Sequence, residues 1–217
     1  MDSILEDVRS SVVAGAKAVF RKHLVEAGEG NLSACIPGRK EFFITPTFND
    51  YESLTGNDVV RMSFDGRQLS SGREPSSEFR LHAAVYAKRP RASCVIHTHS
   101  PFASMLSVAH KPIPVILEEM LIFLGGSVPV SKYGQANTDA LALAAVKALG
   151  RGNAILMANH GAMVCGRSME HAVKMAELVE KMAKVFWGAS HMGKPAVIPK
   201  ASYSLFLKKF ESDFATC

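Results

Sequence analysis

Apolar residues along the chain recur at two kinds of spacing, and glycine or proline residues separate the stretches in which each one holds. Recurrence every three to four residues is typical of helices, whereas short alternating or continuous apolar runs are typical of strands. The helical spacing predicts helices over residues 3–27, 76–88, 101–108, 138–149, 168–187 and 204–214. The short runs predict strands over residues 31–34, 42–45, 59–64, 67–69, 93–100, 128–130, 155–160 and 163–165.

Some predicted elements carry recognisable end signals. Ser3 and Glu6 have the spacing of a capping box, and Asp65-Gly66 lies between two apolar runs as the turn of a hairpin. Gly28 and Gly30 end the first helix. The segment that these two glycines open is either an ordinary helix C-cap or a tight loop whose backbone amides face an anion.

Composition narrows the class of protein. The chain has 217 residues, 47% of them hydrophobic and 21% charged, which is typical of a soluble globular protein and predicts one domain over residues 1–217. The net charge of +5 is modest and the basic residues are scattered, so we predict no nucleic-acid partner. The four cysteines lie far apart, without a Cys-x-x-Cys pair.

The same reasoning predicts where the protein works. The beginning of the chain lacks the basic region of a secretory signal. Glutamates, glycines and a proline interrupt the longest apolar run, residues 112–130, so we predict no membrane span. The cytoplasm is therefore the expected compartment.

Two histidines are predicted on one strand. In an extended conformation His97 and His99 project from the same side, about 6–7 Å apart, which is close enough for both imidazoles to reach one ion. A second apolar run ends in His160, and Glu78 stands where a helix is predicted to begin. Three imidazoles and a carboxylate at the ends of elements predict a site for a borderline divalent ion, with zinc the first choice.

Each of these signals also has an ordinary structural explanation. A His-x-His pair alone can be two hydrogen-bonded polar residues at a strand end. His82 follows Glu78 by four residues and offers a rival ligand pair, although a helix packed on a sheet commonly buries one hydrogen-bonded histidine. Ser76 and Ser77 either cap the helix or, with its free amides, bind a phosphate.

Six short motifs follow one another along the chain: Gly30-Asn31-Leu32-Ser33, Ile44-Thr45-Pro46-Thr47, Tyr51-Glu52-Ser53-Leu54, Pro75-Ser76-Ser77-Glu78, His97-Thr98-His99-Ser100 and Asn159-His160-Gly161. Taken together and in this order, they resemble the class II aldolase/adducin superfamily, specifically its L-fuculose-phosphate aldolase branch. The resemblance covers about residues 5 to 190 and implies a three-layer α/β/α fold with a mixed central sheet. It also implies a homotetramer with active sites between subunits.

The resemblance assigns roles to individual residues. It implies that zinc is held by His97, His99 and His160, and that Glu78 binds the ion at rest and acts as the acid/base during turnover. It further implies that the phosphate of a small sugar-phosphate substrate is held by Asn31, Thr47, Ser76 and Ser77.

Three positions depart from the aldolase pattern. Phe48 replaces the glycine of the phosphate loop, and Gly28 replaces a hydroxyl residue. The stretch that contains the aldolase's proton-donating tyrosine has none here and reads Leu117-Glu118-Glu119-Met120. In this respect it resembles the related methylthioribulose-phosphate dehydratases, in which a glutamate is the acid/base, and Glu119 becomes a second candidate catalytic residue.

Three functions therefore stay open at this point. The first is a zinc aldolase that cleaves a ketose phosphate, such as L-fuculose 1-phosphate, to dihydroxyacetone phosphate and an aldehyde. The second is a metal-dependent dehydratase or decarboxylase of the same superfamily that acts on a related sugar-derived substrate. The third is a non-catalytic, adducin-like interaction module, which the presence of all four metal-ligand positions disfavours.

Overall fold

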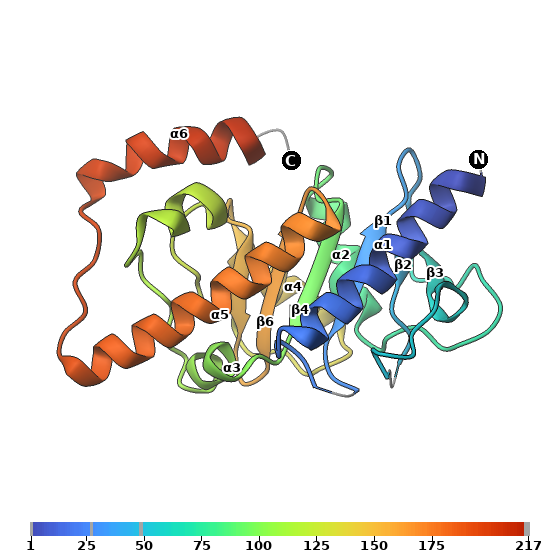
Figure 1. Cartoon of the computed structure of the whole chain (residues 1–217), viewed down its shortest axis with the longest axis horizontal. Coiled ribbons are helices and arrows are strands. Elements are labelled where there is room, and N and C mark those ends of the chain that lie inside the picture. Colours follow the sequence, from blue (N-terminus) through green and yellow to red (C-terminus); the bar gives the residue numbers. More distant parts are fainter. Residues whose placement is uncertain (1, 27, 48–49, 215–217) are drawn as a thin grey trace.

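A sheet of six strands forms the centre of the described part of the chain, residues 2–26, 28–47 and 50–214 of this computed structural model (Figure 1). Their spatial order is β3-β2-β1-β4-β6-β5. The strands are β1 (Asn31–Cys35), β2 (Glu41–Ile44), β3 (Val60–Ser63), β4 (Cys94–Thr98), β5 (Ala154–Met157) and β6 (Gly161–Gly166).

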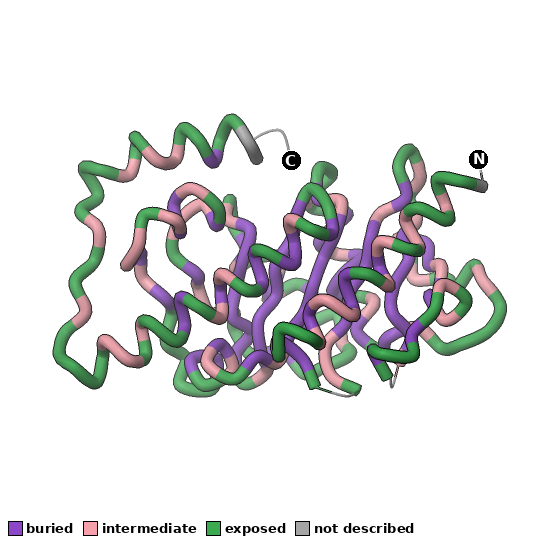
Figure 2. Tube along the Cα trace, in the orientation of Figure 1, coloured by how far each residue is buried: buried purple, intermediate pink, exposed green. Residues whose placement is uncertain are grey.

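Helices cover both faces of this sheet. One face packs against α1 (Asp2–Arg21), α3 (Pro101–Val108) and α5 (Met169–Met192), and the other against α2 (Phe79–Lys88) and α4 (Asp139–Leu149). Alternate residues of each strand enter the two cores, as Val95 and Ile96 of β4 do. Figure 2 shows the strands as a buried layer between the helices. The predicted three-layer α/β/α fold is confirmed.

The pairing of the strands refines the predicted mixed sheet. Every ladder between neighbouring strands β1 to β6 is antiparallel. The parallel part, within the described residues, is a bridge between Val130 and Leu156. The strand predicted over residues 128–130 is thus reduced to this bridge and an antiparallel one between Ile113 and Val128. Likewise, the hairpin strand predicted over 67–69 is reduced to a bridge between Met62 and Gln68.

The first helix ends earlier than the sequence predicts. Helix α1 stops at Arg21, because His23 adopts a left-handed backbone with φ of 55°. The amide of His23 bonds to the carbonyl of Phe20, and the amide of Leu24 bonds to that of Val19. These two bonds form the Schellman end of a helix, in which glycine is the usual residue at the left-handed position. Since His23 takes that position, the sequence offers no stop signal before Gly28.

The helix that follows residue 76 begins later than predicted. Its N-cap is Glu78, so neither Ser76 nor Ser77 caps it. The hydroxyl of Ser76 instead accepts a long hydrogen bond, 3.4 Å, from the amide of Glu78 in the turn before the helix. The two serines therefore lie in the turn that leads into α2, immediately before Glu78 in the sequence.

The chain between α3 and α4 contains an element that the sequence analysis missed. Residues Met120–Leu124 form a π-helix, η2, which Gly125 closes with φ of 79°. Phe210 of α6 (Tyr203–Phe214) packs against this end. Two short 3-10 helices, η1 (Gly56–Asp58) and η3 (Lys200–Ser202), complete the elements of the described chain. No helix within the described residues is long and apolar enough to cross a bilayer.

Candidate metal centre

Three histidines from two parts of the chain meet at one end of the sheet. His97 lies in β4, His99 follows the end of that strand, and His160 lies in the turn between β5 and β6. Their ring centres are 4.7 to 5.1 Å apart, and one potential ligand nitrogen from each lies within 4.8 Å of the others. The strand alternation therefore predicts the His97–His99 pair correctly, and the run ending in His160 supplies the third ring.

A hydrogen bond orients the ring of His97, and a carboxylate lies near the far nitrogen of His99. Nδ1 of the fully buried His97 lies 2.9 Å from the carbonyl oxygen of Ala162, so Nδ1 carries the ring's hydrogen and Nε2 carries none. That Nε2 lies 2.8 Å from Nε2 of His99. Nδ1 of His99 points away from this contact, toward a carboxylate oxygen of Glu29 at 3.9 Å. A hydrogen-bond partner on the far ring nitrogen is the usual way in which proteins orient metal-binding histidines.

The carboxylate of Glu78, at the N-cap of α2, completes the cluster. Its Oε2 lies 3.2 Å from Nε2 of His97, and its Oε1 lies 3.3 Å from Nε2 of His160. Asn31 donates a hydrogen bond of 2.9 Å to Oε2. By contrast, Oε1 is buried and has no hydrogen-bond partner within the described residues.

Burial sets the protonation of the cluster. It lowers the pKa of His97 to about 3 and also lowers the pKa of His160, so both rings are neutral at pH 7. Burial acts to raise the pKa of Glu78, but the imidazoles and the Asn31 hydrogen bond hold that pKa below its usual value. Because His97 and His160 are neutral at pH 7, the hydrogen bond from Asn31 is the interaction that still stabilises the Glu78 carboxylate at that pH.

This arrangement fits a divalent metal ion. Neutral imidazoles and an ionised carboxylate are the forms that bind metals. Two ligand atoms on a tetrahedral ion with bonds of about 2.0–2.1 Å are roughly 3.3–3.4 Å apart, which is close to the 3.3 Å between Oε1 of Glu78 and Nε2 of His160. The buried Oε1 without a partner is the kind of atom that a cation would satisfy. His97, His99 and His160, with Glu78, therefore form a candidate divalent-metal site.

Two glycines allow the strands to approach this closely. A Cβ atom at Gly161 would lie 2.3 Å from the carbonyl oxygen of Thr98 and 3.1 Å from Cδ2 of His99. A Cβ at Gly30, where φ is 63°, would lie 2.7 Å from the carbonyl oxygen of His97. The residue with positive φ in the turn before β6 is Asn159, at 55°, and not Gly161. The role of Gly161 is close packing against the histidine strand.

A pocket of 260 Å³ lies beside the cluster and collects most of the predicted site residues. Thr47, Ser76 and Ser77 line it next to Asn31, and none of its described lining residues is lysine or arginine. The whole lining is Gly28, Glu29, Gly30, Asn31, Pro46, Thr47, Ser76, Ser77, Glu78, His99, Ala136, Asn137 and His160.

Asn31 and His82 have contacts that the sequence did not predict. The Asn31 side chain donates to Glu78, and its carbonyl oxygen lies 2.5 Å from Nε2 of His82. Nδ1 of His82 lies 2.6 Å from the hydroxyl of Ser33. Both ring nitrogens of His82 are thus occupied inside the core, and it does not pair with Glu78 as the rival ligand.

Two other predictions lie outside this cluster. Glu119 is the residue before η2, and its carboxylate lies 2.5 Å from Nζ of Lys181 on α5. Within the described residues, no hydrogen bond or ion pair joins Glu119 to the three histidines or to Glu78. Phe48, which replaces the phosphate-loop glycine, falls outside the described residues.

Three lining residues were missed by the sequence analysis. Glu29 stands between the two glycines that open the segment before β1, so its position in that loop was the available signal. Ala136 and Asn137 come from the loop before α4, where Asn137 has φ of 67° and its carbonyl accepts a hydrogen bond from Arg80. The sequence around residues 136 and 137 contains no motif that links this loop to the histidines. The two are brought together only by the tertiary fold.

Comparison with known proteins gives a consistent picture. A family model described as the class II aldolase and adducin N-terminal domain matches residues 10–187. The chain is 30% identical over 205 residues to a 5-methylthioribulose-1-phosphate/5-deoxyribulose-1-phosphate aldolase of Rhodospirillum rubrum, covering 94% of this chain and 91% of that protein. It is 31% identical over 193 residues to an L-fuculose phosphate aldolase of Escherichia coli O6:H1, with 88% of each covered.

A solved structure extends the similarity to three dimensions. The structure of an L-fuculose 1-phosphate aldolase superposes with a TM-score of 0.90 at 30% identity. The superposition covers 94% of this chain and 96% of the other. The likeness therefore includes the sheet, both helical layers and the end of the sheet at which the histidines meet.

Metal analysis should find about one divalent ion per chain, because three histidines and one carboxylate form one site. His97→Ala and His160→Ala should each lose most of the bound metal. His191→Ala is the matched control, since this exposed histidine of α5 bonds to the carbonyl of Trp187 and should leave the metal content unchanged. Full metal content in the first two variants would place the site elsewhere.

The stability of the metal-free protein should depend on pH through His82. Burial lowers the pKa of His82 from 6.5 to about 4, so between these values the unfolded chain binds a proton that the folded chain does not. The stabilisation is present above pH 6.5 and is lost as the pH falls toward 4. Between pH 7 and pH 5, the free energy of unfolding measured in urea should fall by about 2 kcal/mol more for wild type than for His82→Gln. Identical pH dependence in the two proteins would contradict this assignment.

Proposed function

The chain belongs to the family of class II aldolases and adducin N-terminal domains, and on that premise we propose that it is a metal-dependent aldolase acting on a small ketose 1-phosphate. The superfamily resemblance drawn from the motifs is thereby confirmed. The products would be dihydroxyacetone phosphate and an aldehyde. Candidate substrates are those in the names of its relatives, L-fuculose 1-phosphate and 5-deoxyribulose 1-phosphate.

The observation that carries this proposal is the pairing of a buried carboxylate with three imidazoles at the mouth of a hydroxyl-lined pocket. His97, His99 and His160 would hold the ion together with Glu78. We propose zinc, because imidazole nitrogens and a carboxylate oxygen suit this borderline ion. When bound, a divalent ion supplies Lewis-acid polarisation of a carbonyl and stabilises the negative charge left by carbon–carbon cleavage.

Glu78 has the position of the acid/base. Its Oε1 is buried, faces the histidines and has no hydrogen-bond partner among the described residues, so this atom can hold the proton that is moved. Oε2 is already engaged by Asn31. The two oxygens of one carboxylate therefore have different tasks: one anchors the side chain, and the other exchanges the proton.

The neighbouring hydroxyls would bind the phosphate end of the substrate. Thr47, Ser76 and Ser77 line the pocket, and the second amide hydrogen of Asn31 is available to it. With no lysine or arginine in the described lining, hydroxyl and backbone N–H donors would have to hold the phosphate. Each donor should therefore matter individually.

A dehydratase or decarboxylase acting on a related sugar-derived substrate is the second candidate. It is favoured by one observation, namely that no tyrosine stands among the described lining residues to donate a proton in the aldol reaction. Within the described residues of its own chain, Glu119 pairs with Lys181 and does not bond to the metal cluster. If Glu119 supplies this proton, it would therefore do so in the site of another subunit. The predicted homotetramer would meet that requirement, and it stays a prediction.

Product identification should decide between these reactions. Zinc-loaded protein is incubated with L-fuculose 1-phosphate, 5-deoxyribulose 1-phosphate and 5-methylthioribulose 1-phosphate, and the products are identified by mass spectrometry. We expect dihydroxyacetone phosphate and an aldehyde from at least one of them. Glu78→Gln should retain part of the metal but lower turnover by roughly 10²–10⁴-fold, because it keeps an oxygen ligand and removes the base.

Other products would move the assignment to the second candidate. Loss of water or of carbon dioxide, without dihydroxyacetone phosphate, identifies a dehydratase or a decarboxylase. Turnover near the wild-type rate in Glu78→Gln would assign the proton transfer to another residue.

Phosphate binding should be measurable separately from turnover. In calorimetry with inorganic phosphate, Ser76→Ala should weaken binding by about 1–3 kcal/mol through the lost donor. Ser70→Ala is the matched control, because this hydroxyl accepts from the amide of Arg61 and does not line the pocket. Equal phosphate affinity in the two variants would remove Ser76 from the phosphate site.

A further inference from the structure

A second row of polar side chains runs behind the histidine cluster, between α2 and β1. Glu78, His82 and Tyr86 recur every four residues and so form one stripe along the helix, while Asn31 and Ser33 project from the same face of the strand. These five side chains alternate in one hydrogen-bonded chain. Its links are 2.9 Å from Glu78 to Asn31, 2.5 Å from Asn31 to His82, 2.6 Å from His82 to Ser33 and 2.7 Å from Ser33 to Tyr86.

The ionised carboxylate gives this chain a single direction. Glu78 can only accept, so the amide nitrogen of Asn31 donates to it and the amide oxygen must accept from Nε2–H of His82. Burial keeps His82 neutral, so its Nδ1 accepts from the hydroxyl of Ser33. The hydroxyl of Ser33 then accepts from Tyr86. Each group therefore has one hydrogen-bonding role, and the tautomer of His82 is specified.

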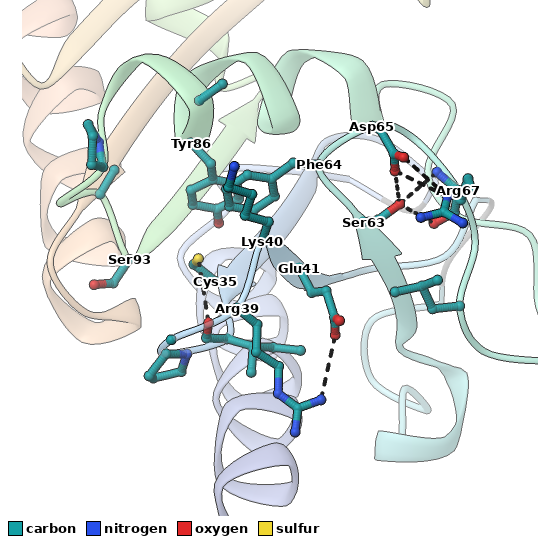
Figure 3. Close-up of a pocket in the computed structure, with 17 residues that line it drawn as sticks. Cys35, Arg39, Lys40, Glu41, Ser63, Phe64, Asp65, Arg67, Tyr86 and Ser93 are labelled. Carbon is teal, nitrogen blue, oxygen red and sulfur yellow. Dashed lines mark hydrogen bonds and ion pairs between the residues drawn. The ribbon is translucent and has the colours of Figure 1, made fainter.

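The far end of the chain is anchored in packed aromatic rings. The ring of Tyr86 stacks on Phe64, with centres 5.6 Å apart and planes at 10°, and also contacts Phe42. Figure 3 shows Tyr86 beside Phe64 and Cys35 in a groove of 1090 Å³. This groove includes the ends of β1 and α2 remote from the metal centre, so the chain extends from the metal centre to the opposite end of the sheet.

The effect of the chain is concentrated on one oxygen of Glu78. Asn31 holds Oε2 from the core side, and Oε1 is left facing His160 at 3.3 Å without a hydrogen bond. A carboxylate held at one oxygen cannot rotate freely about its last bond. An Asn31 side chain that was not itself held by His82 could turn its amide over and present an oxygen to the carboxylate, which would repel it.

We propose that His82 is a positioning residue, which acts through Asn31 to hold the Glu78 carboxylate in the one orientation that presents Oε1 to the metal ligands. The consequence for metal binding requires only that the histidine cluster binds an ion. The consequence for turnover rests on the proposed aldolase function. Neither Asn31 nor His82 would bind the metal directly.

The test compares two replacements of His82. His82→Leu removes both ring nitrogens, whereas His82→Gln can still donate to Asn31 and accept from Ser33. Val85→Ala, a fully buried position on the same helix outside the hydrogen-bonded chain, is the control for loss of core packing. Zinc affinity is measured by competition with a chelator, and kcat and KM on the ketose phosphate that is cleaved.

His82→Leu should lower zinc affinity and kcat by roughly 10- to 100-fold, with a smaller change in KM, as expected for the loss of a group that orients a metal ligand. His82→Gln should recover most of both losses, and Val85→Ala should show neither. The proposal is overturned if His82→Leu behaves like Val85→Ala, or if the glutamine variant is as impaired as the leucine variant.

A spectroscopic measurement keeps the test independent of catalysis and of the leucine variant's folding. In imidazole ¹⁵N spectra of wild type, His82 should be a neutral Nε2–H tautomer, and Ser33→Ala should weaken that preference and reduce zinc affinity. A neutral Nδ1–H tautomer in wild type would contradict the proposed chain. If wild type binds zinc but cleaves no ketose phosphate, the proposed function fails, whereas the zinc and ¹⁵N results still decide the role of His82.

Discussion

Residue Glu78 is only 7% exposed, and a charge removed from water to that extent is costly unless other groups compensate for it. Asn31 compensates one of its oxygens. The neighbouring imidazoles of His97 and His160 are neutral at pH 7, so they do not balance the charge. A divalent cation between the carboxylate and the three rings would do so, and the energetic demand of this one buried group thus favours metal binding.

The positions of the surrounding groups follow from the strand register. Asn31 of β1 lies directly opposite His97 of β4, so the group that holds the carboxylate and the ring that faces it share one face of the sheet. Helix α2 begins over this face, and its N-cap is Glu78. His97 and Asn31 are therefore fixed by strands and Glu78 by the start of α2, whereas His99, His160 and much of the pocket beside them lie in loops.

This division explains what the sequence could predict. Alternation along a strand places His97 and His99 together, and the predicted helices and strands lie close to those observed. Features that depend on contacts between distant segments were not predictable: His23 ends a helix in place of glycine, and Glu119 pairs with Lys181. Asn31 is the clearest case. Its motif predicts a phosphate ligand, but its bonds to Glu78 and His82 depend on the packing of α2 against β1.

The close packing at Gly30 and Gly161 limits which substitutions the metal site can accept. Because backbone atoms lie where those methyl groups would be, the spacing of the histidine rings cannot be altered in small steps, and any larger residue must displace a strand. Glu29, Ala136 and Asn137 line the adjacent pocket from loops and are not held in this way. In directed evolution, new substrate ranges should therefore arise at these three positions, while the metal-binding geometry is inherited unchanged.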